Sequence, residues 1–136
     1  MIEPKGLDLT FEEIKKFHKA FDHPISESPT LIEWDRAKAR YDWIMEEAEE
    51  FMDAIYDKDI VESADALLDC IYFCVGTLVE MGIRPQKLFE IIQNANMTKL
   101  FPDGKPHYRD DGKVIKPDNW IDPHYLLYRE IKNQQK

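Results

Sequence analysis

One stretch of the sequence, residues 64–79, is apolar at almost every position and is interrupted only by Asp65, Asp69 and Thr77. The segment from about Ile60 to Met81 is predicted to form a helix that stops at Gly82. A helix that is apolar on nearly every side is a buried helix. Further helices, from the same chain or from a second copy, are therefore needed to cover it.

Other segments follow the helical period. Helices are predicted at about residues 11–21, from Thr30 or Leu31 to Tyr56, from after Arg84 to about residue 97, and at about residues 124–132. Residues 1–10 are interpreted as an arm. Thr10, with Glu13 three residues later, predicts a capping box for the first helix. Asp59 can cap the helix that starts near Ile60.

After Met97 the composition changes, because glycines and prolines interrupt residues 101–123. The run Asp110-Asp111-Gly112 between two extended segments predicts a hairpin. The fold expected is all-α: a four- to five-helix, bundle-like protomer with a short C-terminal hairpin or loop extension, assembled as a dimer. Its 136 residues suit one domain over residues 1–136, with core helices at about 11–97.

The chain is acidic, with 27 Asp and Glu against 18 Lys and Arg and a net charge of −9. Such a surface repels nucleic acid backbones and anionic membranes, but it is compatible with divalent cations and with anions that such cations carry. The sequence contains no apolar run of about 20 residues, so no membrane span is predicted. No signal peptide is recognised. Cys70 and Cys74 are interpreted as reduced core residues, which favours a cytoplasmic protein.

Acidic residues recur at helical spacing on the second predicted helix. Glu46 and Glu50 are four positions apart and Glu47 and Glu50 are three apart, so both pairs project from one side. On its own, this segment is typical of a solvated acidic face.

The third predicted helix changes that interpretation. Glu62, Asp65 and Asp69 fall within an arc of about 60° on a helix that is otherwise apolar. Buried carboxylates need a positive partner, yet Lys58 is the one base between Tyr41 and Gly82. A divalent metal is the simplest partner, and an all-oxygen ligand set favours Mg²⁺, with Mn²⁺ as the other choice. The four histidines are interpreted as non-ligands (His18, His23, His107 and His124).

Positive groups for a phosphate ligand lie further along the chain. Lys99 could reach a phosphate and Asn94 or Asn96 could bond a base or sugar, although a polar helix terminus explains these residues equally well. Four basic residues on the predicted hairpin could close over a polyphosphate or form a solvated basic surface: Lys105, Arg109, Lys113 and Lys116. The Gly-x-x-x-x-Gly-Lys pattern of a P-loop is absent.

The two-part motif Glu46-Glu47-x-x-Glu50 and Glu62-x-x-Asp65 resembles the signature of the MazG-like all-α nucleoside triphosphate pyrophosphohydrolases. That superfamily includes the phosphoribosyl-ATP pyrophosphohydrolases and the dimeric all-α dUTPases. Asn96-Met97-Thr98-Lys99 and the Asp-Gly-Lys runs at 103–105 and 111–113 are similar to the tail of one MazG-like subgroup. The resemblance covers about residues 11–122, without the long linker of the dUTPase branch.

This resemblance implies a helical dimer or dimer of dimers that uses Mg²⁺ to hydrolyse a nucleotide between its α and β phosphates. By position, it implies metal ligation by Glu47, Glu50, Glu62 and Asp65. Glu46 would be a further ligand or the base that orients water, which makes Glu46, Glu47 and Glu50 the expected catalytic residues. Asn96 and Lys99 would contact the nucleotide. The role of Asp69 and the identity of the nucleotide stay open.

Two other functions remain possible on the sequence. A phosphoribosyl-ATP pyrophosphohydrolase shares the chemistry and differs in substrate. A non-catalytic, metal-binding helical dimerisation module shares the fold, but such a module has no reason to bear an acidic stripe on an apolar helix.

Overall fold

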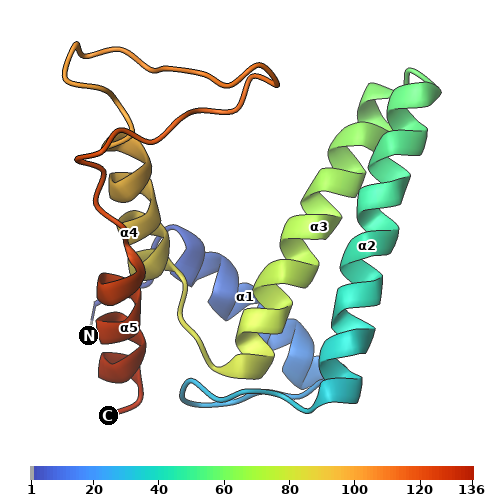
Figure 1. Cartoon of the computed structure of the whole chain (residues 1–136). Helices are drawn as coiled ribbons and strands as arrows, with labels where there is room; N and C mark the ends of the chain where they lie inside the picture. Colours follow the sequence, from blue (N-terminus) through green and yellow to red (C-terminus); the bar gives the residue numbers. More distant parts are fainter. Residues whose placement is uncertain (1) are drawn as a thin grey trace. The chain divides into compact units, whose positions relative to one another are not determined.

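The computed structural model describes residues 2–136, which form five α-helices and no β-strand (Figure 1). The helices are α1 (Leu7–Ala20), α2 (Trp34–Tyr56), α3 (Ile60–Met81), α4 (Gln86–Met97) and α5 (His124–Gln134). The all-α prediction is therefore confirmed. The chain divides into two compact units, one ending at Pro85 and the other spanning Gln86–Lys136. A single domain over residues 1–136 stays a prediction.

Helices α2 and α3 pack side by side as an antiparallel pair joined by a short turn (Figure 1). The Asp59 side chain accepts a hydrogen bond of 3.0 Å from the backbone N–H of Glu62, as predicted for an N-cap. At the other end of α3, Gly82 has a φ of 67°. A Cβ there would lie 2.5 Å from the carbonyl oxygen of Ser28, so glycine is needed for the close approach of that loop.

Helix α1 packs against the C-terminal half of α3. The core between them contains Phe11, Ile14, Val75 and Val79, with Ile25 of the following loop packed against it. This arrangement places α3 between α1 and α2 along only part of its length. Nearer the start of α3, its residues face α2, as the contact of Cys70 Sγ with the Ile44 carbonyl at 3.9 Å shows.

Two predicted helix starts are wrong. Helix α1 begins at Leu7 after Gly6, and the Thr10 N–H donates to the Gly6 carbonyl inside the first turn, so Thr10 is not the N-cap. Helix α2 begins at Trp34 rather than near residue 30. The reason is tertiary: the N–H of Thr30 donates to the carbonyl of Met81 at 2.8 Å, which holds this segment against the end of α3.

The second unit contains α4, α5 and the segment between them. The indole N–H of Trp120 donates to the Ala95 carbonyl at 3.0 Å. The predicted hairpin is reduced to one antiparallel bridge between Tyr108 and Val114. Gly112 turns the chain there with a φ of 87°. The extension is therefore confirmed as a turn-containing loop.

Helix α3 is not buried on every side. Leu67, Leu68, Ile71 and Tyr72 expose between 41% and 63% of their surface. The expectation of a fully buried helix is wrong for one copy of the chain, because α1 and α2 leave one side of α3 uncovered. No helix within residues 2–136 has the length and apolar character needed to cross a membrane.

Candidate active site

Four carboxylates approach one another where α2 faces α3: Glu47, Glu50, Asp65 and Asp69, named here the carboxylate cluster. Burial raises the pKa of Glu47 to about 7, helped by a hydrogen bond with Glu50 and by the charges of Glu50, Asp69 and Asp65. The pKa of Asp69 is also raised, first by burial and then by the charges of Asp65 and Glu50. Each helix therefore supplies two members of one electrostatically coupled group.

One oxygen of the carboxylate cluster is both buried and unsatisfied. The Oε2 atom of Glu47 is inaccessible to solvent, and no group in residues 2–136 forms a hydrogen bond with it. A buried carboxylate oxygen without a partner is costly. The burial and charge effects on Glu47 all favour the protonated form, so this position lacks positive charge.

A hollow of about 280 Å³ extends the carboxylate cluster toward the turn between the helices. It is lined by Glu50 and Glu62, two of the predicted ligands, and by Asp53, Ala54, Asp57 and Asp59. The sequence reasoning did not single out Asp53. Its signal was available, because Glu47, Glu50 and Asp53 are spaced three residues apart and share one side of α2.

These residues fit a divalent cation. The donor set is entirely carboxylate oxygen, which suits Mg²⁺ or Mn²⁺. A dication would give the unsatisfied Glu47 oxygen a partner and would offset the repulsion that raises the pKa of Glu47.

The remaining predicted site residues are each described within their own unit. Glu46 is exposed on α2. Asn96 is exposed near the end of α4, and the half-buried Lys99 follows it, donating its backbone N–H to the Asn96 carbonyl at 3.1 Å. Both belong to the second unit. Their roles and that of Glu46 stay predictions.

The basic residues of the loop extension are partly engaged within that loop. Arg109 forms an ion pair with Asp111, and the Lys116 ammonium lies 4.3 Å from the centre of the Trp120 ring. The backbone N–H groups of Lys105 and Lys113 donate to Asp103 and Asp111. Both interpretations of these residues, closure over a polyphosphate and a solvated basic surface, stay untested.

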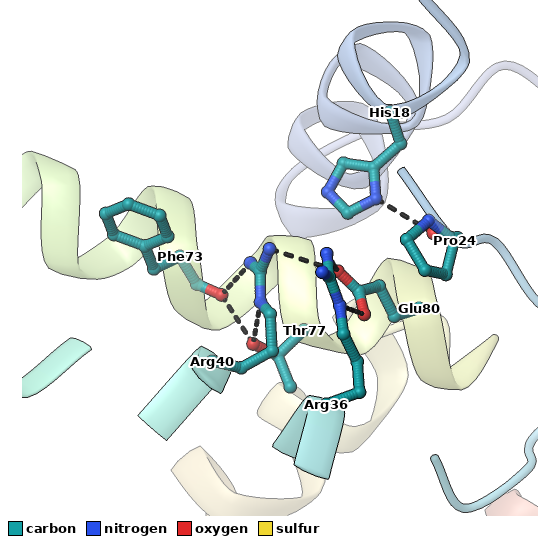
Figure 2. A network of polar contacts seen from close by, with 7 residues as sticks. All are labelled: His18, Pro24, Arg36, Arg40, Phe73, Thr77 and Glu80. Carbon is teal, nitrogen blue, oxygen red and sulfur yellow. Dashed lines mark hydrogen bonds and ion pairs between the residues drawn. The ribbon is translucent and has the colours of Figure 1, made fainter. Parts of the chain in front are cut away.

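A second group with metal-like spacing lies between α1 and α3. Ligand atoms of His18, His23 and Glu80 are within 4.8 Å of one another. However, Glu80 is already bound by the guanidinium groups of Arg36 and Arg40, and the His18 ring bonds through Nδ1 to the Pro24 carbonyl (Figure 2). Two cations at Glu80 would repel a dication. We therefore interpret this group as part of the helix packing.

Comparison with known proteins agrees with the carboxylate motif. The sequence profile of the phosphoribosyl-ATP pyrophosphohydrolase family matches residues 14–96, which is more than half of the chain. That span contains the carboxylate cluster and Glu62. No curated protein sequence matches the chain significantly.

A solved structure is similar over nearly the whole chain. It is the crystal structure of a candidate NTP pyrophosphohydrolase from Exiguobacterium sp. 255-15, with 34% sequence identity and a TM-score of 0.55. The match covers 96% of this chain and 97% of that one. The protein is thus a pyrophosphohydrolase enzyme, and the chain belongs to the phosphoribosyl-ATP pyrophosphohydrolase family of the MazG-like all-α NTP pyrophosphohydrolases.

Proposed function

We propose that the protein hydrolyses a (deoxy)nucleoside triphosphate to the monophosphate and pyrophosphate in a reaction that depends on Mg²⁺. The observation that carries this proposal is the buried, unpartnered oxygen of Glu47 inside a cluster of acids. A group that needs a cation, beside a hollow lined by further carboxylates, suits a substrate whose phosphates arrive with a metal ion.

The proposed ligands are Glu47, Glu50, Glu62 and Asp65, and Asp69 is close enough to support them electrostatically. Mg²⁺, when bound, neutralises phosphate charge and lowers the pKa of a water molecule, and Mn²⁺ could replace it. Asn96 and Lys99 are proposed to contact the nucleotide. Lys99 would then stabilise the charge that develops on the phosphates.

The chemical step joins a water oxygen to the α phosphorus and breaks the bond between that phosphorus and the oxygen bridging to the β phosphate. Pyrophosphate leaves with the bridging oxygen. We propose that Glu46, which is exposed on α2, orients the water and accepts its proton, or acts as a further ligand. The carboxylates of α2 and α3 hold the reacting groups in place for an in-line displacement.

Phosphoribosyl-ATP is the second candidate substrate. The family whose profile matches this chain is named for phosphoribosyl-ATP pyrophosphohydrolase, which favours this substrate over an unrelated nucleotide. Both substrates undergo the same α–β cleavage, so the carboxylate cluster does not distinguish them.

We also propose that the enzyme works as a homodimer or homotetramer. The exposed apolar residues around the middle of α3 support this, since the side chains of Leu67, Leu68, Ile71 and Tyr72 lack full cover in one copy of the chain. A second copy could bury them through a twofold interface.

A nucleotide panel tests the proposed function. Ribonucleoside and deoxynucleoside triphosphates and phosphoribosyl-ATP are incubated with the enzyme and Mg²⁺, and pyrophosphate release is measured. We expect pyrophosphate from at least one of them and none after addition of EDTA. Activity that persists in EDTA contradicts the metal-dependent mechanism, and preferential turnover of phosphoribosyl-ATP selects the second candidate.

A further inference from the structure

A buried ion pair joins α2 to α3 at the end away from their connecting turn. Arg40 of α2 exposes 3% of its surface and Glu80 of α3 exposes 1%. Figure 2 shows both side chains between the helices, with Arg36 completing the group. Neither Arg40 nor Glu80 belongs to the carboxylate cluster. Buried ion pairs are often not net stabilising, so their presence here calls for another physical reason.

The hydrogen bonds of Arg40 reach successive turns of α3. Its Nε donates to Thr77 Oγ1 at 3.0 Å, its Nη1 to Glu80 Oε2 at 3.1 Å and its Nη2 to the Phe73 carbonyl at 2.8 Å. A guanidinium group is planar and its donors are fixed relative to one another, so three such bonds define one position. Apolar side chains lack this directionality. Arg40 therefore fixes how far α2 is shifted along α3.

That shift matters at the carboxylate cluster. Glu47 follows Arg40 by seven residues on α2, and Asp69 precedes Thr77 by eight on α3, about two helical turns in each case. Both helices are continuous over these distances. The carboxylates thus lie between two fixed points, the Asp59-capped turn at one end and Arg40 at the other.

Gly76 makes room for this arginine. A Cβ at Gly76 would lie 2.5 Å from Nη2 of Arg40 and 3.1 Å from Nε2 of His18. Glycine inside a helix costs stability relative to alanine. Its presence in the middle of α3 is explained by the close approach of the guanidinium group.

We infer that Arg40 is a positioning residue of the active site. By fixing the register of α2 against α3, it sets the spacing at which Glu47 and Glu50 face Asp65 and Asp69. This inference rests on the proposed function, because it assumes that these carboxylates bind Mg²⁺ together. Gly76 acts with Arg40 by leaving space for its side chain.

The three hydrogen bonds from Arg40 to α3 are named here the Arg40 clamp. Two variants alter the clamp in different ways. Arg40→Lys keeps the positive charge but cannot make three fixed bonds, and Gly76→Ala keeps every charge while crowding the guanidinium group. Val79→Ala is the matched control, because it removes buried apolar volume from the α1–α3 core without changing an Arg40 partner.

Two measurements are made on each variant: the Mg²⁺ concentration that gives half of the maximal rise in Tm without nucleotide, and the Mg²⁺ dependence of pyrophosphate release. We expect Arg40→Lys and Gly76→Ala to raise both half-saturating concentrations about tenfold or more, the size of effect seen when groups that orient metal ligands are changed. Val79→Ala should lower Tm while leaving both concentrations unchanged.

Two results overturn the inference. One is an unchanged Mg²⁺ response in both clamp variants. The other is a loss of Mg²⁺ response in Val79→Ala that equals the loss in the clamp variants when their decreases in Tm are also equal. That result would mean that the clamp affects stability alone. Absence of any Mg²⁺ response in the unmodified enzyme contradicts the proposed function instead, so the two failures are distinguishable.

Discussion

Glu50 lies one turn beyond Glu47 on α2, and after burial its carboxylate is the largest cause of the raised pKa of Glu47. Two neighbouring carboxyl groups repel each other less when one of them holds a proton. The raised pKa of Glu47, about 7, fits this arrangement. A proton on Glu47 and a cation bound beside it would relieve the same repulsion in this part of the carboxylate cluster.

The first prediction concerns the pH dependence of stability. The pKa of Glu47 is about 7 in the folded protein, whereas its ordinary value is 4.5. At a pH between these two values, the folded state therefore binds a proton that the unfolded state has lost. Stability without metal must then fall as pH rises through this window. Glu47→Gln removes the titrating group, so its Tm relative to the unmodified enzyme should rise between pH 5 and pH 8. Parallel Tm profiles of the two proteins would contradict the assignment.

The second prediction separates metal ligation from structural support. Glu50→Gln and Asp65→Asn keep the side-chain volume and remove one negative charge each. Stability without metal should hold or rise because repulsion falls, whereas activity should drop by orders of magnitude. Stability is measured as Tm without Mg²⁺, and activity is measured as the rate of pyrophosphate release.

Glu49 provides the internal control for that prediction. It is exposed and lies about 100° around the helix from Glu50. Glu49→Gln should leave activity and the Mg²⁺ response nearly unchanged. If Glu49→Gln and Glu50→Gln behave alike in both measurements, the metal-site interpretation is wrong.

The third prediction concerns assembly. Leu68 exposes 63% of its surface on the half of α3 that α1 does not cover. Sedimentation at micromolar concentration should give a particle of at least twice 16.1 kDa. Leu68→Glu places a charge on this apolar surface and should shift the particle toward the single-chain mass. A 16.1 kDa particle for the unmodified chain would exclude the dimer.

The fourth prediction concerns the start of α3. Asp59→Ala removes the side chain that accepts from the Glu62 N–H, and the loss of such an N-cap costs about 1 kcal/mol of unfolding free energy. Denaturant unfolding measures the change. Asp57→Ala is the control in the same turn, because Asp57 ends α2 through its backbone. Equal losses in the two variants would show that the cap contributes nothing specific.

Local signals in the sequence predicted α3 well. Its start follows a capping aspartate and its end precedes a glycine, so both bounds depend on residues next to them. The end of α2 at Tyr56 was predicted for the same reason. The starts of α1 and α2 were missed, because the bond from Thr30 to Met81 joins residues far apart in sequence and overrides helical propensity.

For the candidate site too, some residues could be predicted from the sequence and others could not. Helical spacing grouped acidic residues on one side of each helix, but it did not separate Glu47, which lies in the carboxylate cluster, from the exposed Glu46. The ligand set itself came from the resemblance to the family and stays a prediction. Nothing local distinguishes Arg40 or Glu80 from ordinary surface charges. The two residues bind each other across 40 positions of sequence, and only the packed structure shows that both are buried.

The most direct test of the proposed chemistry is hydrolysis of the preferred nucleotide in ¹⁸O-labelled water with Mg²⁺, followed by mass spectrometry of the products. Attack at the α phosphorus predicts label in the nucleoside monophosphate and unlabelled pyrophosphate. Label in pyrophosphate would place the attack at the β phosphorus. Release of orthophosphate with a nucleoside diphosphate would contradict α–β cleavage altogether.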